Sequence, residues 1–456
     1  MAGGALIPDL VGPQDRLSSH QRRLVAICGL GGMLEFLDGY IIAFVLAFIT
    51  GPWHLQYGQT AIVLLSSGVG ALFGSLVWGQ IADWMGRRAA FAATICTCGL
   101  GSFALALTPE GNWIYLAVMR LVVGFGTGGF FIPMMLVQEF LPRASRGRAC
   151  GIVSAAVASG LVFGALSGSF LAPVFGWRGM FVVGGIPLFF GLAVLFLIPE
   201  SPQWALSKGK RDLAQRALEW AVPRGTEVTL PNAAVAPESQ RLQEVLRYPG
   251  SLAMGVLGNL GCVTGYYGLV MWSPTLIAQV HGISGATAAK WMIGISLSGL
   301  VSRSVTGALS DRFGRRRCGI VAAFLTGVAL ILTALVGHGD LFDKQSFGLL
   351  LALTFVFADS TMVILAIYTP EVWPAHVRGR GSGLAYAAGG IGKIVGPLGF
   401  AMVLGTSNII RPMATVDAII NAFGFLAVAY VLAGVTFLVA KPEVGLAADV
   451  RRPIPA

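Results

Sequence analysis

Six ionisable side chains fall inside stretches that are otherwise apolar: Glu35, Asp38, Arg120, Arg303, Asp359 and Lys393. An ionised group in hydrocarbon is costly, so residues of this kind are kept where they pair with one another, carry a proton or bind an ion. Three of them are acids and three are bases, which leaves the set close to neutral as a whole. The chemistry that these residue types predict is proton exchange and anion binding.

Asp38 and Arg120 are predicted to lie at the same depth. Asp38 falls about fourteen residues into its apolar stretch, which in a helix is roughly 21 Å. Arg120 falls about seven residues into a stretch that runs the opposite way, roughly 20 Å from the same boundary of a ~30 Å hydrocarbon core. A nearby opposite charge favours an ionised carboxylate, whereas desolvation favours a protonated one. We therefore interpret Asp38 as a proton carrier and Arg120 as its partner or as a substrate contact, with a static ion pair as the alternative.

Two further acids are candidates for the proton. Glu35 precedes Asp38 by three residues, which places both near one face of a helix. Glu35 either shares the proton or contacts a neighbouring helix. Asp359 lies in the tenth apolar stretch, where it either exchanges a proton or is neutralised by Lys393.

The second half of the chain supplies candidate substrate contacts. Lys393 lies about fourteen residues into its stretch, near the middle of the membrane, where a cation suits a substrate carboxylate. Arg303 lies only about two turns from the end of its stretch, so we expect its guanidinium to extend to the membrane surface. The aromatic candidates either stack on a substrate ring or pack between helices: Tyr266, Tyr267 and Trp272.

The elements that must position these residues are membrane helices. The chain is 55% hydrophobic and 11% charged, whereas about 25% of the residues of a soluble domain are charged. Apolar runs of about twenty residues are long enough to cross a bilayer, and the sequence contains twelve candidates: 24–50, 60–80, 89–108, 113–138, 147–172, 179–198, 250–279, 286–309, 317–337, 347–370, 379–405 and 416–440. We predict an all-α membrane protein with twelve transmembrane helices.

A polar stretch divides the spans into two sets of six. The predicted domains are a bundle over 1–198, a cytoplasmic loop over 199–249 and a second bundle over 250–456. With the amino terminus inside, most of the 31 lysines and arginines face the cytoplasm, as the distribution of positive charge in membrane proteins requires. Both termini are then expected in the cytoplasm and the protein in the inner membrane. The lysines and arginines on the cytoplasmic side account for the net charge of +10, so no nucleic-acid partner is expected.

Two motifs occur twice, in the same order. Gly-x-x-x-Asp-x-x-Gly-Arg-Arg returns 228 positions after its first occurrence. Its two copies consist of Gly79, Asp83, Gly86, Arg87 and Arg88, and of Gly307, Asp311, Gly314, Arg315 and Arg316. Glu-x-x-Pro-x-x-x-Arg-Gly-Arg returns after 232 positions, with Glu139 and Arg146 in one copy and Glu371 and Arg378 in the other. A duplicated membrane unit is typical of secondary transporters, and we expect these loops to control a conformational switch.

The first motif resembles the signature loop of the major facilitator superfamily, and the resemblance extends over essentially the whole chain. It implies two six-helix bundles around a central cavity that opens alternately to each side. The segment Pro199–Trp204 is similar to a stretch of the sugar porters and related metabolite transporters. Tyr-Tyr-Gly followed by Trp-x-Pro, over 266–274, is similar to organic-acid and nicotinate-type symporters. Asp38-Gly39-Tyr40 resembles the start of the Asp-Gly-Phe-Asp motif of aromatic acid:proton symporters, with Ile41 in place of the second acid.

The leading hypothesis is a secondary active transporter that takes up a small organic acid, including an aromatic carboxylate, together with protons. A drug or metabolite:proton antiporter is an alternative, although Ala165 stands where those exporters carry proline. Uptake of a neutral sugar-like metabolite is another. An enzyme is not expected, because no nucleophile–base set, metal-ligand spacing or phosphate-binding loop is present. No cofactor or metal is expected, and the partners are the substrate, protons and the lipid bilayer, with the protein acting as a monomer.

Overall fold

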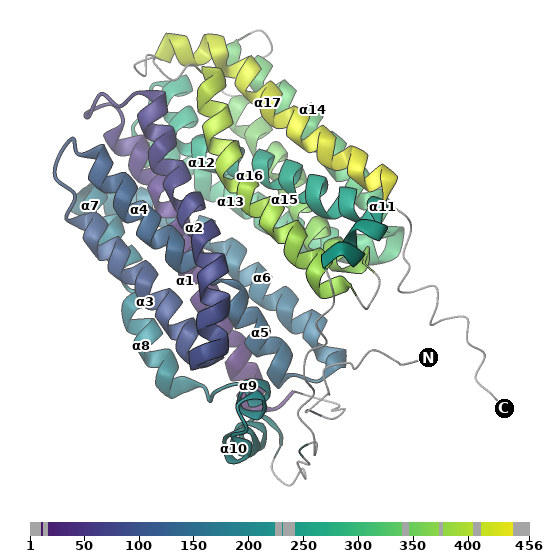
Figure 1. Cartoon of the computed structure of the whole chain (residues 1–456). Helices are drawn as coiled ribbons and strands as arrows, with labels where there is room; N and C mark the ends of the chain where they lie inside the picture. The colour runs from purple at the N-terminus through teal and green to yellow at the C-terminus, as the bar shows by residue number, and fades with distance from the viewer. Residues whose placement is uncertain are drawn as a thin grey trace. The chain divides into compact units, whose positions relative to one another are not determined.

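The computed structural model describes residues 11, 17–223, 230, 242–339, 346–373, 377–404 and 412–440. All regular secondary structure within these ranges is helical (Figure 1). The described residues form two compact units. The first unit takes them from 1–42, 69–167 and 174–239, and the second from 43–68, 168–173 and 240–456.

The first ten α-helices of the chain contribute to the first unit. They are α1 (Ser19–Ile49), α2 (Tyr57–Met85), α3 (Arg87–Ala106), α4 (Trp113–Thr127), α5 (Phe131–Phe140), α6 (Arg143–Leu166), α7 (Ala172–Gly184), α8 (Pro187–Leu197), α9 (Pro202–Ser207) and α10 (Arg211–Ala221). A short π-helix, η1 (Ser167–Leu171), joins α6 to α7. Residues 43–49 of α1 and 57–68 of α2 belong to the second unit. Within the first unit, α3 packs against α4, α5 and α8.

The second unit contains the remaining helices. They are a 3₁₀ turn η2 (Leu242–Arg247), α11 (Pro249–Leu252), a π-helix η3 (Ala253–Gly258), α12 (Asn259–His281), α13 (Gly285–Phe313), α14 (Arg315–His338), α15 (Ser346–Glu371), α16 (Arg378–Leu404) and α17 (Pro412–Val439). Here α12 packs against α16 and α17, and α13 packs against α15.

The helices are long and apolar enough to span a bilayer, which confirms the predicted fold class. Ten segments of the described residues meet both criteria. One of them, Arg148–Leu197, has 50 residues, or about 75 Å of helix, more than twice the ~30 Å core of a bilayer. It is broken at Gly176, whose φ is 68°, so it accounts for two crossings. The 23-residue α12 adds another, and the total agrees with twelve.

Glycines let pairs of helices meet backbone to backbone. In the first unit, a β-carbon on Gly70 or Gly74 of α2 would collide with main-chain atoms of α4. In the second unit, a β-carbon on Gly392 or Gly396 of α16 would collide with main-chain atoms of α12. Each pair of glycines is four residues apart, so it lies on one face of its helix. Small residues at this spacing are typical of membrane helices that pack closely.

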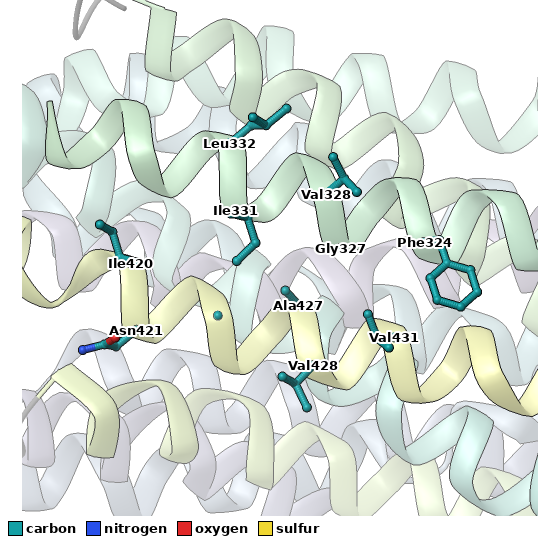
Figure 2. A pocket seen from close by; sticks show the side chains of 11 residues that line it. Phe324, Gly327, Val328, Ile331, Leu332, Ile420, Asn421, Ala427, Val428 and Val431 are labelled. Atoms are coloured by element: carbon teal, nitrogen blue, oxygen red, sulfur yellow. The ribbon is translucent and has the colours of Figure 1, made fainter. Parts of the chain in front are cut away.

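The second unit carries a groove between α14 and α17 (Figure 2). Its volume is about 700 Å³, and of the residues that line it only Asn421 is polar. Two of the lining residues, Val328 and Val428, are 55% and 69% exposed. The groove offers no charged group to a carboxylate, so the candidate site lies among the buried charges instead.

Candidate functional site

Asp38 of α1 is completely buried in the first unit. Its Oδ1 accepts a hydrogen bond of 2.5 Å from the hydroxyl of Ser102 on α3. A β-carbon on Gly184 would come within 2.8 Å of the same oxygen. Glycine at that position therefore leaves room for the carboxylate. A single neutral donor holds Oδ1, and Oδ2 has no hydrogen-bond partner within the described residues.

Arg120 of α4 binds the backbone of α1 beside Asp38. It is 1% exposed, and its guanidinium donates to the carbonyl oxygens of Asp38 and Gly39, at 3.1 Å each. The structure therefore brings together the two residues that were predicted to share a depth. Among the described side chains, however, no carboxylate lies within salt-bridge distance of this guanidinium. Arg120 is committed to two main-chain carbonyls, so the Asp38 carboxylate is not locked in a direct ion pair.

Glu35 lies one turn before Asp38 in α1 and is also completely buried. In the part of the chain that the structure describes, neither carboxylate oxygen of Glu35 has a hydrogen-bond partner. The side chain of Thr94 on α3 lies near this carboxyl, and its hydroxyl donates to the carbonyl of Phe91 at 2.8 Å. The first unit thus contains two buried carboxyls on one helix, and neither forms a salt bridge with a described residue.

The second unit holds a closed triangle of polar groups. Arg303 of α13 donates from Nε to Oδ1 of Asp359 on α15, at 2.5 Å. The hydroxyl of Tyr266 on α12 donates to the same oxygen at 3.1 Å, and Nη2 of Arg303 donates to that hydroxyl at 3.1 Å. The expectation that Arg303 extends to the membrane surface is therefore wrong, because a buried carboxylate lies within its reach.

Helix lengths contain the signal that would have found this pair. Arg303 lies about ten residues before the end of α13, and Asp359 lies about twelve residues before the end of α15. The doubled motifs follow both helices, so both distances are measured from the same side of the unit. Measured from the doubled motifs, and not from the ends of the apolar stretches 286–309 and 347–370, the comparison of depths would have linked these two residues as well.

Cations lie at both ends of a pair of tyrosines. The rings of Tyr266 and Tyr267 are 6.0 Å apart in an edge-to-face arrangement. The guanidinium carbon of Arg303 is 5.6 Å from the Tyr266 ring, and Nζ of Lys393 is 5.2 Å from the Tyr267 ring. Cations at this range are attracted to the faces of aromatic rings. The structure thus places three of the predicted substrate contacts in one row with Arg303.

Trp272 packs between helices. Its indole Nε1 donates to the carbonyl of Pro397 on α16 at 3.1 Å, and its ring stacks on Phe400 at 5.7 Å. The side chain is completely buried. This environment favours the packing alternative over contact with a substrate.

The doubled motifs of the first unit meet each other. Arg87 forms an ion pair of 2.8 Å with Asp83 and lies 3.7 Å from Glu139. Glu139 in turn accepts a hydrogen bond from the hydroxyl of Ser201. Arg146 donates to the carbonyl of Leu141 at the end of α5. The first copies of the two motifs therefore form one polar cluster with the segment that follows α8.

Glu200 connects that segment to the start of α3. Its carboxylate accepts from the backbone N–H of Arg88 at 3.0 Å and from that of Ser201 at 2.9 Å. Gly86, the residue before α3, has no side chain to accept from the helix, so Glu200 supplies the anion that the positive end of a helix favours. Trp204 adds a hydrogen bond of 3.0 Å to the carbonyl of Asp83. Glu200, Ser201 and Trp204 were noted for their resemblance to a family segment but were not predicted to join the motif.

The second copies repeat the contact between the motifs, because Arg315 and Glu371 are the equivalents of Arg87 and Glu139. Arg315 pairs with Glu371, and Arg316 donates to the carbonyls of Phe437 and Leu438. A β-carbon on Gly314 would have no atom within 4 Å, and the same holds for Gly307, whereas Gly79 lies near Phe131. The side chains of two predicted residues lie outside the described residues: Asp311 and Arg378. Within the described residues, no group of three or more His, Cys, Asp or Glu could hold a metal ion.

Comparison with known proteins identifies the class. A niacin transporter of Acinetobacter baylyi is 29% identical over 383 residues, which cover 82% of this chain and 85% of the relative. A 4-hydroxybenzoate transporter of the same organism is 25% identical over 404 residues, 86% of each chain. The solved structure of the xylose transporter XylE from E. coli, in a partially occluded inward-open conformation, matches with a TM-score of 0.70 at 19% identity, over 94% of this chain and 99% of that one.

The family model described as Major Facilitator Superfamily matches residues 28–397 and 300–452. The matching family and relatives are transporters, so the protein is a membrane transporter and not an enzyme. The fold, the doubled motifs and this match agree, and the chain belongs to the major facilitator superfamily.

Proposed function

We propose that the protein imports a small organic acid together with protons, by alternating access across the inner membrane, and that the acid is an aromatic carboxylate. Both termini are assigned to the cytoplasm, because most of the 31 lysines and arginines then face inward, in line with the positive-inside rule. Protons and anion move in the same direction in this scheme.

The observation that carries the proposal is the environment of Asp38. The carboxylate is buried, accepts one hydrogen bond from Ser102, and lies beside a guanidinium that is bound to backbone carbonyls. Addition of a proton to Asp38 breaks no salt bridge, and the Arg120 cation remains. The interior then gains a positive charge, which an anionic substrate neutralises. This relationship gives a physical reason for proton and anion to travel together.

Two features support an aromatic carboxylate. Niacin and 4-hydroxybenzoate, which the names of the two relatives specify, each combine a ring with a carboxylate. In this chain, Lys393 supplies a cation and Tyr267 an aromatic ring, 5.2 Å apart. An edge or face of a ring substrate can pack against the tyrosine while its carboxylate approaches the ammonium group.

The test is uptake of radiolabelled niacin and 4-hydroxybenzoate into vesicles that contain the purified protein. An inwardly directed proton gradient should drive accumulation above equilibrium, and a protonophore should abolish it. Addition of substrate without an imposed gradient should make the external medium more alkaline. Vesicles without protein are the control.

Each competing function has its own outcome in the same assay. Accumulation of substrate that is driven by an outwardly directed proton gradient would indicate an antiporter. Equal competition by niacin and by its neutral amide would show that the carboxylate is not recognised, and a neutral metabolite would then be the better assignment.

A further inference from the structure

We propose that Arg303 is the cation that binds the substrate carboxylate, and that Asp359 occupies this place while the site is empty. Proton binding to Asp359 and substrate binding to Arg303 then take place together. The inference rests on the proposed function and adds to it a binding residue and the means by which a proton in the second unit is linked to substrate.

The geometry of Asp359 is that of a bound carboxylate in a prepared site. Its Oδ1 receives the guanidinium Nε of Arg303 and the hydroxyl of Tyr266 at the same time. Its Oδ2 faces the backbone of α13 at Gly299, where any β-carbon would collide with it. Gly299 precedes Arg303 by four residues, so both lie on one face of α13. The site is therefore shaped for one carboxylate against a guanidinium and a phenol.

Charge balance makes the exchange reversible. In the empty site the arginine cation faces the aspartate anion. When Asp359 takes a proton it becomes neutral, and the anion of the substrate takes its place beside Arg303. Net charge within the unit is the same before and after, so neither state leaves an unpaired buried charge of the kind that strongly destabilises proteins. The O–H bond formed on Asp359 accounts for the proton, and no other bond is made or broken.

Exposure indicates which partner meets the substrate. The Arg303 side chain is 15% exposed, whereas that of Asp359 is 5% exposed. Within the triangle the guanidinium binds Asp359 through Nε and the Tyr266 hydroxyl through Nη2. Arginine is suited to this exchange because its planar fork binds carboxylates through two donors at once.

The tyrosine row extends the site towards Lys393. Tyr266 contacts Arg303 through its hydroxyl and its ring, and the edge-to-face contact continues to Tyr267. A substrate whose carboxylate replaces Asp359 would present its ring to these tyrosines. We expect Arg303 to bind the carboxylate directly and Lys393 to add electrostatic attraction from the far end of the row.

Other titratable groups face the triangle from the neighbouring helices. They are Cys262 and Tyr266 of α12, Arg303 of α13 and Tyr430 of α17. The contacts of α15 with α14 are neutral hydrogen bonds, such as Thr333 with Thr354. Asp359 is thus the carboxylate that faces Arg303 within this group of titratable side chains.

A second contact joins α13 to α15 independently of charge. The hydroxyls of Thr306 and Ser360 form a hydrogen bond of 2.7 Å. Thr306 follows Arg303 by three residues and Ser360 directly follows Asp359, so this contact lies beside the ion pair on both helices. It also provides a matched control, because Thr306→Val removes an inter-helix hydrogen bond without altering the charges.

The experiment measures binding and transport of radiolabelled niacin by the full-length protein in vesicles, at acidic and at alkaline pH. Arg303→Gln should weaken niacin binding about tenfold to a hundredfold, as expected for the loss of a charge-assisted hydrogen bond, and Arg303→Lys should recover part of it. Asp359→Asn imitates the protonated acid, so it should bind niacin with little dependence on pH and lose proton-driven accumulation. Thr306→Val should resemble wild type in both respects.

The charge-neutral double variant Arg303→Gln/Asp359→Asn decides between binding and structure. If Arg303 contacts the carboxylate, the double variant folds but binds niacin as poorly as Arg303→Gln. Recovery of wild-type affinity in the double variant would mean that the pair is structural, and would overturn the inference. Wild-type binding by Arg303→Gln alone would overturn it while leaving the proposed function intact. Failure of wild type to bind any carboxylate would overturn both.

Discussion

The carboxylate of Glu200 fills the space that any side chain on Gly86 would need. A β-carbon at this position would collide with both carboxylate oxygens, and the φ of Gly86 is 106°. The equivalent glycine of the repeat, Gly314, has a φ of 90° and open space beside it. The two copies of the motif therefore share a backbone conformation that favours glycine, and among the described residues a distant segment caps the helix of the first copy alone.

The two glycines form a matched pair for mutation. Alanine at either position should cost about 1–3 kcal/mol, because non-glycine residues rarely adopt this backbone conformation. Gly86→Ala should be the more destabilising of the two, since it also displaces Glu200 from Arg88. Thermal unfolding of the purified variants in detergent measures the difference. Equal destabilisation would show that the contact with Glu200 contributes nothing, and Gly86→Ala/Glu200→Ala should recover part of the loss.

Replacement of Asp38 should separate accumulation from exchange. Asp38→Asn still accepts a hydrogen bond from Ser102 but cannot carry a proton, so gradient-driven accumulation of niacin should be lost while exchange of labelled for unlabelled niacin persists. Ser102→Ala is the control, because it removes the hydrogen bond and keeps the acid. Full accumulation by Asp38→Asn would mean that Glu35 or Asp359 carries the proton instead.

Asp83 and Glu139 contact the same arginine but differ in burial. The Asp83 side chain is 72% exposed, and exposed ion pairs contribute only about 0–1 kcal/mol. The Glu139 side chain is 9% exposed, and removal of one partner from a buried pair costs about 3–5 kcal/mol. Glu139→Ala should therefore lower the unfolding temperature far more than Asp83→Asn.

Asp83→Asn should act on conformation rather than on stability. Loss of its charge weakens the contact with Arg87 and shifts the balance between conformations. Labelling of engineered cysteines on the side of the membrane that carries the motifs should therefore increase. Unchanged labelling with unchanged transport would reduce this aspartate to a signal of topology.

Removal of the Lys393 cation should reduce affinity for carboxylates. Lys393→Ala is expected to weaken niacin uptake far more than it lowers the amount of protein in the membrane. Uptake normalised to immunoblot signal measures this ratio. Nicotinamide, which lacks the carboxylate, should compete poorly in wild type, and equal competition by acid and amide would contradict a role for Lys393 in charge selection.

The sequence predicted how deep each charged residue lies in the membrane better than it predicted which way the side chain points around the helix axis. Asp38 and Arg120 were expected at one level, and the structure places them side by side. Their depth did not reveal that the guanidinium binds the carbonyls of α1, because rotation of a helix about its axis is set by packing that one sequence does not display. For the same reason Glu35 could be placed on a helix face but not matched to a neighbour.

Side-chain reach accounts for the error at Arg303. A long side chain near a helix end can extend outward to water or inward to a buried partner, and both are compatible with its position in the sequence. The carboxylate of Asp359 decides the direction. The repeated motifs, by contrast, were recognisable because several residues at fixed spacing are required together. The role of Glu200 needed the structure, since it lies 112 positions from the backbone that it binds.

The glycine contacts between α12 and α16, and between α2 and α4, also bear on how the units move. Interlocked side chains resist sliding, because each knob must leave its hole before the helix can advance. Gly392 and Gly396 instead present smooth backbone to α12, and Gly70 and Gly74 do the same to α4. Such surfaces permit small shear displacements of one helix along another. Each unit therefore contains a helix interface that can slide slightly when the charge of a buried residue changes, and such a shift would displace the ends of the helices.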